Sequence, residues 1–539
     1  MKQLGLVIIL LGLFAATPVP RAPSAPGRPS LVVVIVVDQM RADYLQRYAG
    51  LFNHGFTRLT TRGAWFQRAM YPYMNTFTCV GHTTIGTGTL PYKHGIVDNT
   101  WYDRQQQKKV TCTEDAATTE VGYGPYTGIG DSAHNMRMPS LAEIMRRDDH
   151  ARVATLSLKA RAAIGLAGHS ADSVVWFDDR GGWETSSAFA AAPLPWMSTF
   201  AAAHPIDADA NKVWDRLLPA DRYQGPDDAP GERGPAGWSR TFPHPLGASG
   251  ARGFYLHWES SPYSDAYLEQ MTEDTIDSLQ LGQRQTGGTD FLGVSFSALD
   301  YVGHAYGPRS QEVQDLLAHL DVSIGRLLDH LDEKVGAGHY VLALTADHGV
   351  ADVAEQTEGG GRVAPTSITQ AINAALEPVL GQGPFVATTI ESDVYFKPGI
   401  YERVEGHPAA YAAAVKAVSG LPGVARVFRG TDLASAAARA SHDNVIRAAA
   451  LSYVPGRSGD LIVVPRQGWE MTTSAASHGS PYAYDQRVPV VFYGAGVRAG
   501  VRRQPVSPLD IAATLAAIVG VHLPSPDGHS LTPLLGRSR

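Results

Sequence analysis

The sequence contains few cysteines, no surplus of basic residues and no apolar run long enough for a comfortable membrane span. Its 539 residues include two cysteines, Cys79 and Cys112. Two cysteines exclude a disulfide framework, and these two lack the spaced partners of a thiolate zinc site. Two interpretations remain open for them: one disulfide bond or two free thiols.

The charge balance also narrows the class of partner. Lysine and arginine number 45 against 52 aspartates and glutamates, which gives a net charge of −7. Proteins that bind duplex DNA or anionic membranes normally carry a basic surplus. We therefore expect no nucleic-acid polymer as a partner. The hydrophobic fraction of 44% supports a sizeable core and argues against a disordered chain.

The N-terminus has the pattern of an export signal. A short basic start, Met1-Lys2, precedes an apolar run from Leu4 to Ala16 and then small residues. This run is shorter than the roughly 20 residues of a membrane helix. It predicts a secretory signal peptide over residues 1–22, a linker over the Pro- and Ser-rich residues 23–30, and a periplasmic or secreted protein without a stable membrane span. An uncleaved N-terminal anchor is the alternative.

Runs of aliphatic residues predict the fold class. Leu31–Val37 is aliphatic throughout, as in a strand that is buried on both faces of a parallel sheet. Similar runs are Arg152–Leu158, Phe291–Leu299, Tyr340–Ala346 and Val488–Tyr493, and leucines at helical spacing lie between two of them. We predict an α/β domain over residues 31–535, with a doubly wound, mostly parallel sheet flanked by helices. Insertions at about 205–262 and 360–465 are expected to form a cap or smaller lobe.

Aspartates and histidines recur where the predicted strands end. They are Asp38, Asp300, His304, Asp347 and His348, with His478 in a later Ser/Gly-rich loop. In open α/β sheets, ligands bind outside the carboxyl ends of the strands. Three aspartates and three histidines suit zinc and other first-row metals. Six ligands exceed the needs of one open tetrahedral zinc, so they favour two metals that share a substrate.

A candidate nucleophile lies in the segment Asn75–Ile85, whose small polar residues suit the start of a helix. A hydroxyl at Thr78 would face free backbone N–H groups that favour a phosphate. Threonine needs a base or a metal to act as a nucleophile. A plain helix cap is the structural alternative for Thr78. Cys79 is the rival nucleophile, but it has no close His/Asn pair of its own.

Five motifs together resemble one family. The segments TFTCVGHTTIGTG…HGIVDNTWYD, SLKAR, LDYVGHAYGP, TADHG and SHGSPYAYDQRVPV follow one another in the order found in the alkaline phosphatase superfamily. They are most similar to its bacterial branch with a threonine nucleophile, the PafA/PhoK type. This branch is related to nucleotide pyrophosphatases/phosphodiesterases. The resemblance runs from about Leu31 to Leu535.

The resemblance implies a role for each motif residue. Thr78 corresponds to the nucleophile, and Asn99 to an amide that donates to a phosphoryl oxygen. Lys159 and Arg161 correspond to a cationic pair that faces the remaining oxygens. One zinc would be held by Asp38, Asp347 and His348 and would also contact Thr78, and the other would be held by Asp300, His304 and His478. The chain departs from many relatives at Cys79-Val80, where they have Gly-Pro or Pro. The loss of proline predicts a looser turn at the nucleophile.

The expected function is therefore an exported alkaline phosphatase that uses two Zn²⁺ ions and hydrolyses small phosphate monoesters through a phosphothreonine. One alternative is a nucleotide pyrophosphatase/phosphodiesterase with the same two-metal site. Another is a catalytically inactive exported protein that binds metal or phosphate. Lys159 and Arg161 distinguish the first two, because two cations favour a dianionic monoester. The alternative for that pair is a solvated basic pair after a strand.

Overall fold

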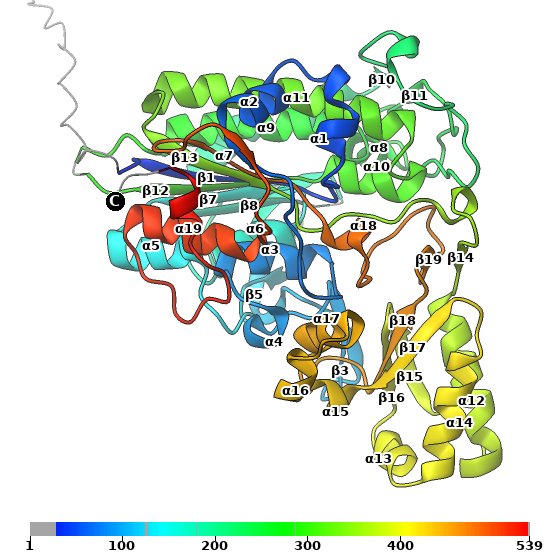
Figure 1. Cartoon of the computed structure of the whole chain (residues 1–539). Helices are drawn as coiled ribbons and strands as arrows, with labels where there is room; N and C mark the ends of the chain where they lie inside the picture. Colours follow the sequence, from blue (N-terminus) through cyan, green and yellow to red (C-terminus); the bar gives the residue numbers. More distant parts are fainter. Residues whose placement is uncertain (1–27, 124–127, 179, 286, 537–539) are drawn as a thin grey trace, which may run out of the picture.

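The structure is a computed structural model that describes residues 28–123, 128–178, 180–285 and 287–536 (Figure 1). The predicted signal peptide and most of the predicted linker lie outside the described residues. In the part of the chain that is described, we find no helix long and apolar enough to cross a membrane.

One large sheet forms the centre of the molecule (Figure 1). It has eleven strands in the described residues, in the order β21-β2-β20-β13-β1-β12-β7-β8-β9-β5-β6. The five strands from β13 to β8 are parallel. The bounds are β13 Tyr340–Thr345, β1 Leu31–Val37, β12 Asp290–Phe296, β7 Val153–Ser157, β8 Ser173–Asp178, β20 Val490–Gly494, β2 Ala64–Phe66, β21 Gly500–Arg502, β9 Gly182–Ser186, β5 Glu114–Gly122 and β6 Ile129–Asp131.

The aliphatic run at the start of the domain becomes the central strand. All seven residues of β1 are buried, because β12 and β13 flank it and helices cover both faces. Leu31 lies opposite Asp290 on one side and Tyr340 on the other, so the three strands end at the same edge. The predicted fold class, a doubly wound and mostly parallel sheet, is confirmed.

One strand runs in a direction that the sequence left open, and one local expectation was wrong. The run Val488–Tyr493 gives β20, which lies antiparallel to β13, with Val490 opposite Thr345. The run Phe291–Leu299 does not continue as a strand to Asp300: β12 ends at Phe296, and helix α10 (Ala298–Tyr306) begins two residues later. Apolar runs alone indicate neither the direction of a strand nor the point where a buried strand becomes a buried helix.

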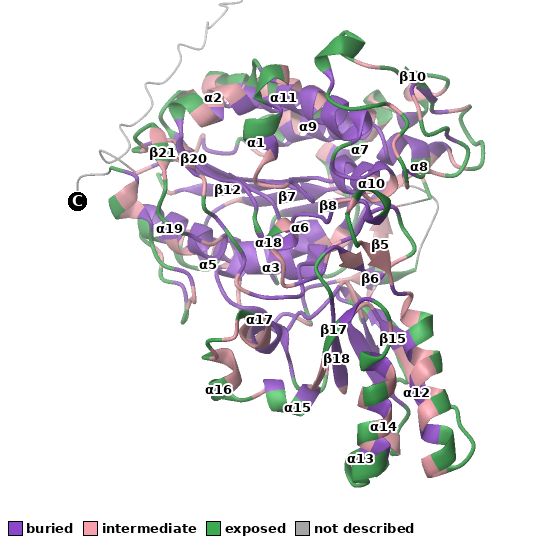
Figure 2. Cartoon of the chain, turned by 45° about the vertical axis from the view of Figure 1, so that its right-hand side comes forward, coloured by how far each residue is buried: buried purple, intermediate pink, exposed green. Residues whose placement is uncertain are grey.

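Helices cover the sheet on both faces (Figures 1 and 2). One face carries α2 (Gly55–Arg62), α9 (Pro262–Ser278) and α11 (Gln311–Leu331); the leucines at helical spacing form the buried side of α11. The other face carries α3 (Thr78–Thr87), α5 (Leu141–Asp149), α6 (Ala160–Ala167) and α19 (Leu509–Val519). Helices α3 and α6 approach closely, since a Cβ at Gly86 would collide with the carbonyl oxygen of Gly165.

A smaller lobe extends from one end of the domain (Figure 1, lower right). Its sheet has the order β15-β16-β18-β17 and packs against two helices around its own apolar cluster. The bounds are β15 Val386–Ile390, β16 Asp393–Phe396, β17 Val424–Arg429, β18 Leu461–Pro465, α12 Pro365–Leu380 and α14 Pro408–Ser419. The segment 205–262 has only short elements, including β10 (Val213–Trp214), β11 (His244–Pro245) and α8 (Phe254–Glu259).

Candidate active site

The carboxyl ends of the central strands bring the candidate ligands together. Asp38 directly follows β1, and Asp347-His348 follow β13. Asp300 and His304 lie one turn apart on α10, so they share a face of that helix. His478 lies in the loop that leads into β20. Because β20 is antiparallel, its first residues lie at the edge where β1 and β13 end.

The three histidines are oriented in the same way. The Nδ1 atom of His304 is 2.8 Å from the carbonyl oxygen of Ala476, that of His348 is 3.0 Å from Gly349 O, and that of His478 is 2.7 Å from Thr76 O. A carbonyl only accepts, so each Nδ1 carries the proton and donates. Wherever the ring is neutral, its Nε2 therefore keeps a lone pair, the tautomer that a metal ligand requires.

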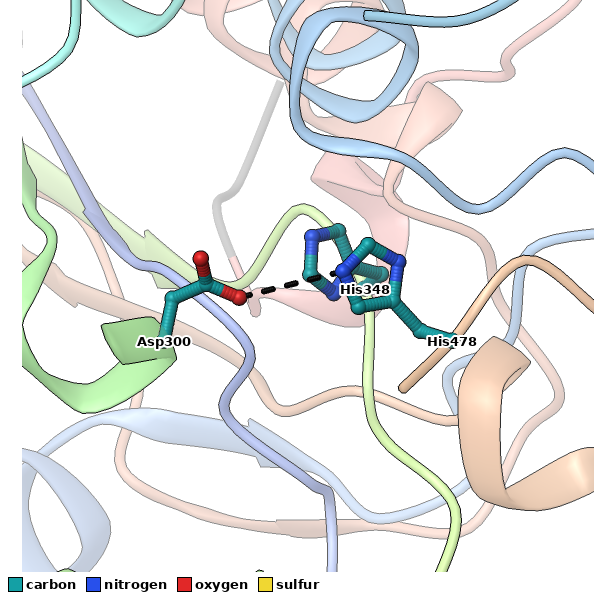
Figure 3. Close-up of side chains that lie close together, drawn as sticks. All are labelled: Asp300, His348 and His478. Atoms are coloured by element: carbon teal, nitrogen blue, oxygen red, sulfur yellow. Dashed lines mark ion pairs between the residues drawn. The ribbon is translucent and has the colours of Figure 1, made fainter. Parts of the chain in front are cut away.

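The ligand atoms form two overlapping groups. Asp38, Asp347 and His348 make one, and Asp300, His348 and His478 the other; within each, the ligand atoms all lie within 4.8 Å of one another. The rings of His348 and His478 are stacked at 3.6 Å, and the Nε2 atom of His478 is 3.8 Å from Asp300 Oδ1 (Figure 3). His304 lies outside both groups, although its Nε2 is 3.3 Å from Asp300 Oδ1.

The first group contains buried polar atoms without hydrogen-bond partners. Asp38 Oδ1, Asp347 Oδ2 and His348 Nε2 are buried and have no hydrogen bond among the described residues. Such atoms are costly to bury unless a ligand satisfies them. Two carboxylate oxygens and one imidazole nitrogen fit a first-row divalent metal such as zinc.

Burial and charge shift the pKa values in this region. Burial, reinforced by the charge of Asp347, raises the pKa of Asp38 to about 7. Burial lowers the pKa of His348 to about 4, so its ring is neutral near pH 7. For His304 burial acts in the same direction, but the Asp300 carboxylate outweighs it and raises the pKa to about 9. The Asp38 carboxylate thus lies where negative charge is poorly tolerated without a cation.

Lys159 contacts two of the candidate ligands and also lines the neighbouring cavity. It precedes α6, and its buried Nζ donates to Asp38 Oδ2 at 2.8 Å and to Asp300 Oδ2. The ammonium also lies 4.7 Å from the centre of the Tyr301 ring. The expected role of Lys159 and Arg161 as a cationic pair that faces the substrate stays a prediction, because Lys159 contacts the two carboxylates and also lines the cavity that Arg161 lines.

Arg161, in the first turn of α6, has a different environment. It lines a cavity of about 630 Å³ together with Asn99 and Lys159. Its Nε is buried without a hydrogen-bond partner among the described residues. Trp176, Asp178 and Glu184 also line the cavity. An unpaired guanidinium beside an open cavity can bind an anionic group bidentately.

Thr78 is the first residue of α3, and all ten residues of this helix are buried. The helix start lies directly against the ligand cluster. A Cβ at Gly81 would be 2.6 Å from the Cβ of Asp347 and closer still to its carbonyl oxygen. Glycine at 81 is what lets the Thr78 end of the helix approach the end of β13. Thr78 is therefore held beside the first ligand group.

The segment around Asn99 is fastened to the same helix. Asn99 Oδ1 accepts a hydrogen bond of 2.8 Å from the backbone N–H of Cys79. This bond orients the amide, whose NH₂ group is then available to an acceptor in the cavity. Cys79 also forms a disulfide bond with Cys112, so it has no thiol to act as a nucleophile. The turn that lacks the family's proline is thus fastened by two other links.

Two positioning residues were missed at the sequence level. Gln39 donates from its backbone N–H to Asp347 Oδ1 and from Nε2 to Asp300 Oδ1, at 3.1 Å and 2.6 Å. It has a positive φ of 65°, which nothing about a glutamine in sequence indicates. His82, buried beneath the cluster, has Nδ1 2.9 Å from Thr78 O and 3.3 Å from Asp347 Oδ2. It lies inside the Thr78 motif, but its spacing gives no hint of this contact.

Comparison with known proteins identifies the class of this fold and site. Residues 32–487 match the family described as type I phosphodiesterase / nucleotide pyrophosphatase. Because the match covers most of the chain, the protein belongs to this family. A solved murine member, ectonucleotide pyrophosphatase/phosphodiesterase 5, has a TM-score of 0.55 at 13% identity, which shows a shared fold.

Within that family, the chain is similar to bacterial alkaline phosphatases along nearly its whole length. It is 32% identical to PhoV of Synechococcus elongatus, over 95% of this chain and 94% of PhoV. It is 30% identical to PafA of Elizabethkingia meningoseptica, over 98% of both chains. The crystal structure of PafA has a TM-score of 0.87 and covers 95% of this chain. The resemblance inferred from the five motifs is confirmed.

A substitution at Gly81 should test the contact between helix and ligand cluster. In Gly81→Ala, the new methyl group meets the backbone and Cβ of Asp347, which cannot move aside without displacing a ligand. We expect a loss of about 1–3 kcal/mol in stability from overpacking and a roughly 10–100-fold loss of turnover from misplacement. Thermal unfolding, metal content and phosphatase assays would measure these effects.

Gly50→Ala is the matched control, because a Cβ at Gly50 would have no heavy atom within 4 Å. It should leave all three measurements close to those of the wild type. Wild-type metal content and turnover in Gly81→Ala would contradict the inferred contact.

Proposed function

We propose that this protein is an exported, zinc-dependent alkaline phosphatase that hydrolyses small phosphate monoesters through a phosphothreonine at Thr78. The observation that carries the proposal is the pair of overlapping ligand groups at the start of the helix that begins with Thr78. Relatives named alkaline phosphatases, similar over almost the whole chain, support the same reaction class. Export rests on the N-terminal sequence pattern alone.

In the proposed site, Asp38, Asp347 and His348 hold one zinc, and Asp300, His304 and His478 hold the other. His348 belongs to both groups of candidate ligand atoms. When bound, two zincs supply Lewis-acid stabilisation of the entering and leaving oxygens and an activated water. Gln39 and His82 fix the orientation of the aspartates, and Lys159 offsets part of their charge.

In the proposed reaction, one residue attacks the phosphorus and two others bind the phosphoryl oxygens. Thr78 Oγ1 attacks phosphorus as the ester oxygen departs, and the departing alcohol ends with the proton that the threonine loses. Water then cleaves the phosphothreonine and restores the hydroxyl. Arg161 and the Asn99 amide bind non-bridging oxygens, and their donors are most effective where charge accumulates on the phosphoryl group. The net reaction is phosphate monoester plus water to alcohol plus phosphate.

Phosphodiester hydrolysis is the second candidate. The cavity of about 630 Å³ beside Arg161 has aromatic groups, Trp176 and Phe177, in its wall. It has room for a second ester substituent, and the family's name includes phosphodiesterases. A diester, however, carries one negative charge, so it gains less from Arg161 than a dianionic monoester does.

Metal removal tests the two-metal site. Dialysis against EDTA should abolish phosphatase activity, and added Zn²⁺ should restore it, because the buried ligand atoms otherwise lack a cation. Elemental analysis of the active enzyme should give about two zincs per chain. Full activity in demonstrably metal-free protein would contradict the mechanism.

Substitution of Thr78 tests the nucleophile. Thr78→Ala should keep the zinc content but lose most turnover, whereas Thr78→Ser should retain part of it, because a hydroxyl remains at the start of α3. Acid quenching of the wild type during turnover should trap phosphate on Thr78, which peptide mass spectrometry can locate. Phosphate trapped on a histidine instead would refute the assignment.

Substitution of Arg161 tests whether this residue makes the enzyme prefer phosphate monoesters to diesters. One charge-assisted hydrogen bond contributes roughly 1.5–3 kcal/mol, so Arg161→Ala should lower kcat/KM for a monoester by roughly 10–100-fold and for a diester much less. The double variant with Lys159→Ala should lose roughly 10²–10⁴-fold, but it also breaks the ion pairs to Asp38 and Asp300. The single variant is therefore the cleaner test.

Arg180→Ala is the matched control. Arg180 lines the same cavity, but its guanidinium is paired with Asp178 and Glu120. It should leave the monoester-to-diester ratio nearly unchanged. Equal losses on both substrates in Arg161→Ala would exclude a monoester-specific role, and a wild-type enzyme that prefers the diester would favour the second candidate.

A further inference from the structure

Asn99 lies outside regular secondary structure, between helix α4 (Pro91–His94) and strand β3 (Thr100–Asp103). Among the described residues, β3 pairs with β4 (Lys108–Thr111) in a two-stranded sheet that is separate from the large one. The large sheet therefore does not fix the place of the Asn99 amide. Other contacts hold this side chain beside the start of α3.

Those contacts come from both halves of the disulfide between Cys79 and Cys112, which we call the cystine. The backbone N–H of Cys79 donates to Asn99 Oδ1 at 2.8 Å, and the backbone N–H of Cys112 donates to the carbonyl oxygen of Asn99 at 2.9 Å. The disulfide joins the two donor residues covalently, and both belong to the main apolar cluster. The side chain and the main chain of Asn99 are thus both held with respect to Thr78, which directly precedes Cys79.

The far end of the β3–β4 hairpin is attached to the smaller lobe. The ring centres of Tyr102 and Tyr395 are 5.8 Å apart, and Arg104 Nη2 donates to Asp460 Oδ1 at 2.8 Å. Tyr395 belongs to β16, and Asp460 directly precedes β18. Without the cystine, motions of the smaller lobe would reach Asn99 through the hairpin more freely. The cross-link ties Asn99 to the helix that begins with the proposed nucleophile.

We propose that the cystine is a positioning element for catalysis, which keeps the Asn99 amide where its NH₂ group donates to a phosphoryl oxygen. This inference rests on the phosphatase reaction proposed above and on the part of Asn99 in it. A donor is most effective when it is already in place as charge develops in the transition state. A displacement of about 1 Å can lower a rate by roughly 10²-fold. Hydrogen bonds can open locally, whereas a covalent link persists.

Removal of the disulfide tests this inference in a double-mutant cycle with Asn99. The variant Cys79→Ala with Cys112→Ala keeps both backbone donors and leaves no free thiol. We expect it to lower kcat/KM for a monoester by roughly 3–30-fold and to weaken inhibition by inorganic phosphate, because the amide is displaced. Asn99→Ala should lose roughly 10–100-fold, as expected for one charge-assisted hydrogen bond. In the Asn99→Ala background, removal of the disulfide should lower kcat/KM by less than about twofold more, because no amide remains to be displaced.

A control separates this effect from lower stability. The cystine joins residues 33 apart in the sequence, so its removal should lower the Tm, and all rates are measured well below the Tm of each variant. Ile372→Ala is the matched control, because Ile372 is buried in the apolar cluster of the smaller lobe. It should lower the Tm but leave kcat/KM and phosphate inhibition unchanged. If the double-cysteine variant does not fold, Cys112→Ala alone gives the same comparison.

The inference fails if the disulfide variant, folded and with the zinc content of the wild type, keeps the wild-type kcat/KM. It also fails if the variant loses the same factor with and without the Asn99 amide, because the cystine would then act by another route. Wild-type rates in Asn99→Ala would overturn this inference and the proposed role of Asn99, but not the phosphatase reaction. A wild type that hydrolyses no phosphate monoester would overturn the proposed function, and this inference with it.

Discussion

The structure depends on keeping several carboxylates together in a buried site. Asp38, Asp300 and Asp347 are at most 4% exposed and lie at one edge of the sheet, where their mutual repulsion and their loss of hydration both oppose folding. Lys159 offsets part of that charge by contacting two of the three. The remaining unpaired atoms face one another, and divalent cations satisfy such an arrangement better than any further side chain could.

The arrangement of the strands and helices brings these side chains together at one edge of the sheet. Parallel strands β1 and β13 release Asp38 and Asp347 at one edge, and the antiparallel β20 brings the His478 loop to the same place. The helices add the rest: α10 presents Asp300 and His304 one turn apart, and α3 reaches Asp347 because residue 81 has no side chain. The positions of the candidate ligands therefore depend on where these strands and helices begin and end, as well as on the residues themselves.

Much of this could be predicted from sequence, for identifiable reasons. A run such as Leu31–Val37 followed by Asp38 indicates both a buried strand and its end, so the fold class and the candidate ligand residues were accessible. The positions of Gln39 and Lys159 were not. A glutamine with positive φ has no sequence signature, and the contacts of Lys159 depend on which carboxylates surround it in space. The pairing of Cys79 with Cys112 likewise depends on where the hairpin after Asn99 packs.

The separate environments of Lys159 and Arg161 bear on how such a site could change its substrate. Lys159 contacts Asp38 and Asp300, so any change there alters the field of the ligand cluster and affects every substrate. Arg161 lies two residues later, on the cavity side, and forms no ion pair among the described residues. Its loss is expected to leave the candidate ligands in place. In the proposed mechanism, preference for a dianionic monoester would therefore depend mainly on Arg161, and phosphomonoesterases and phosphodiesterases could share one metal site while differing at this wall.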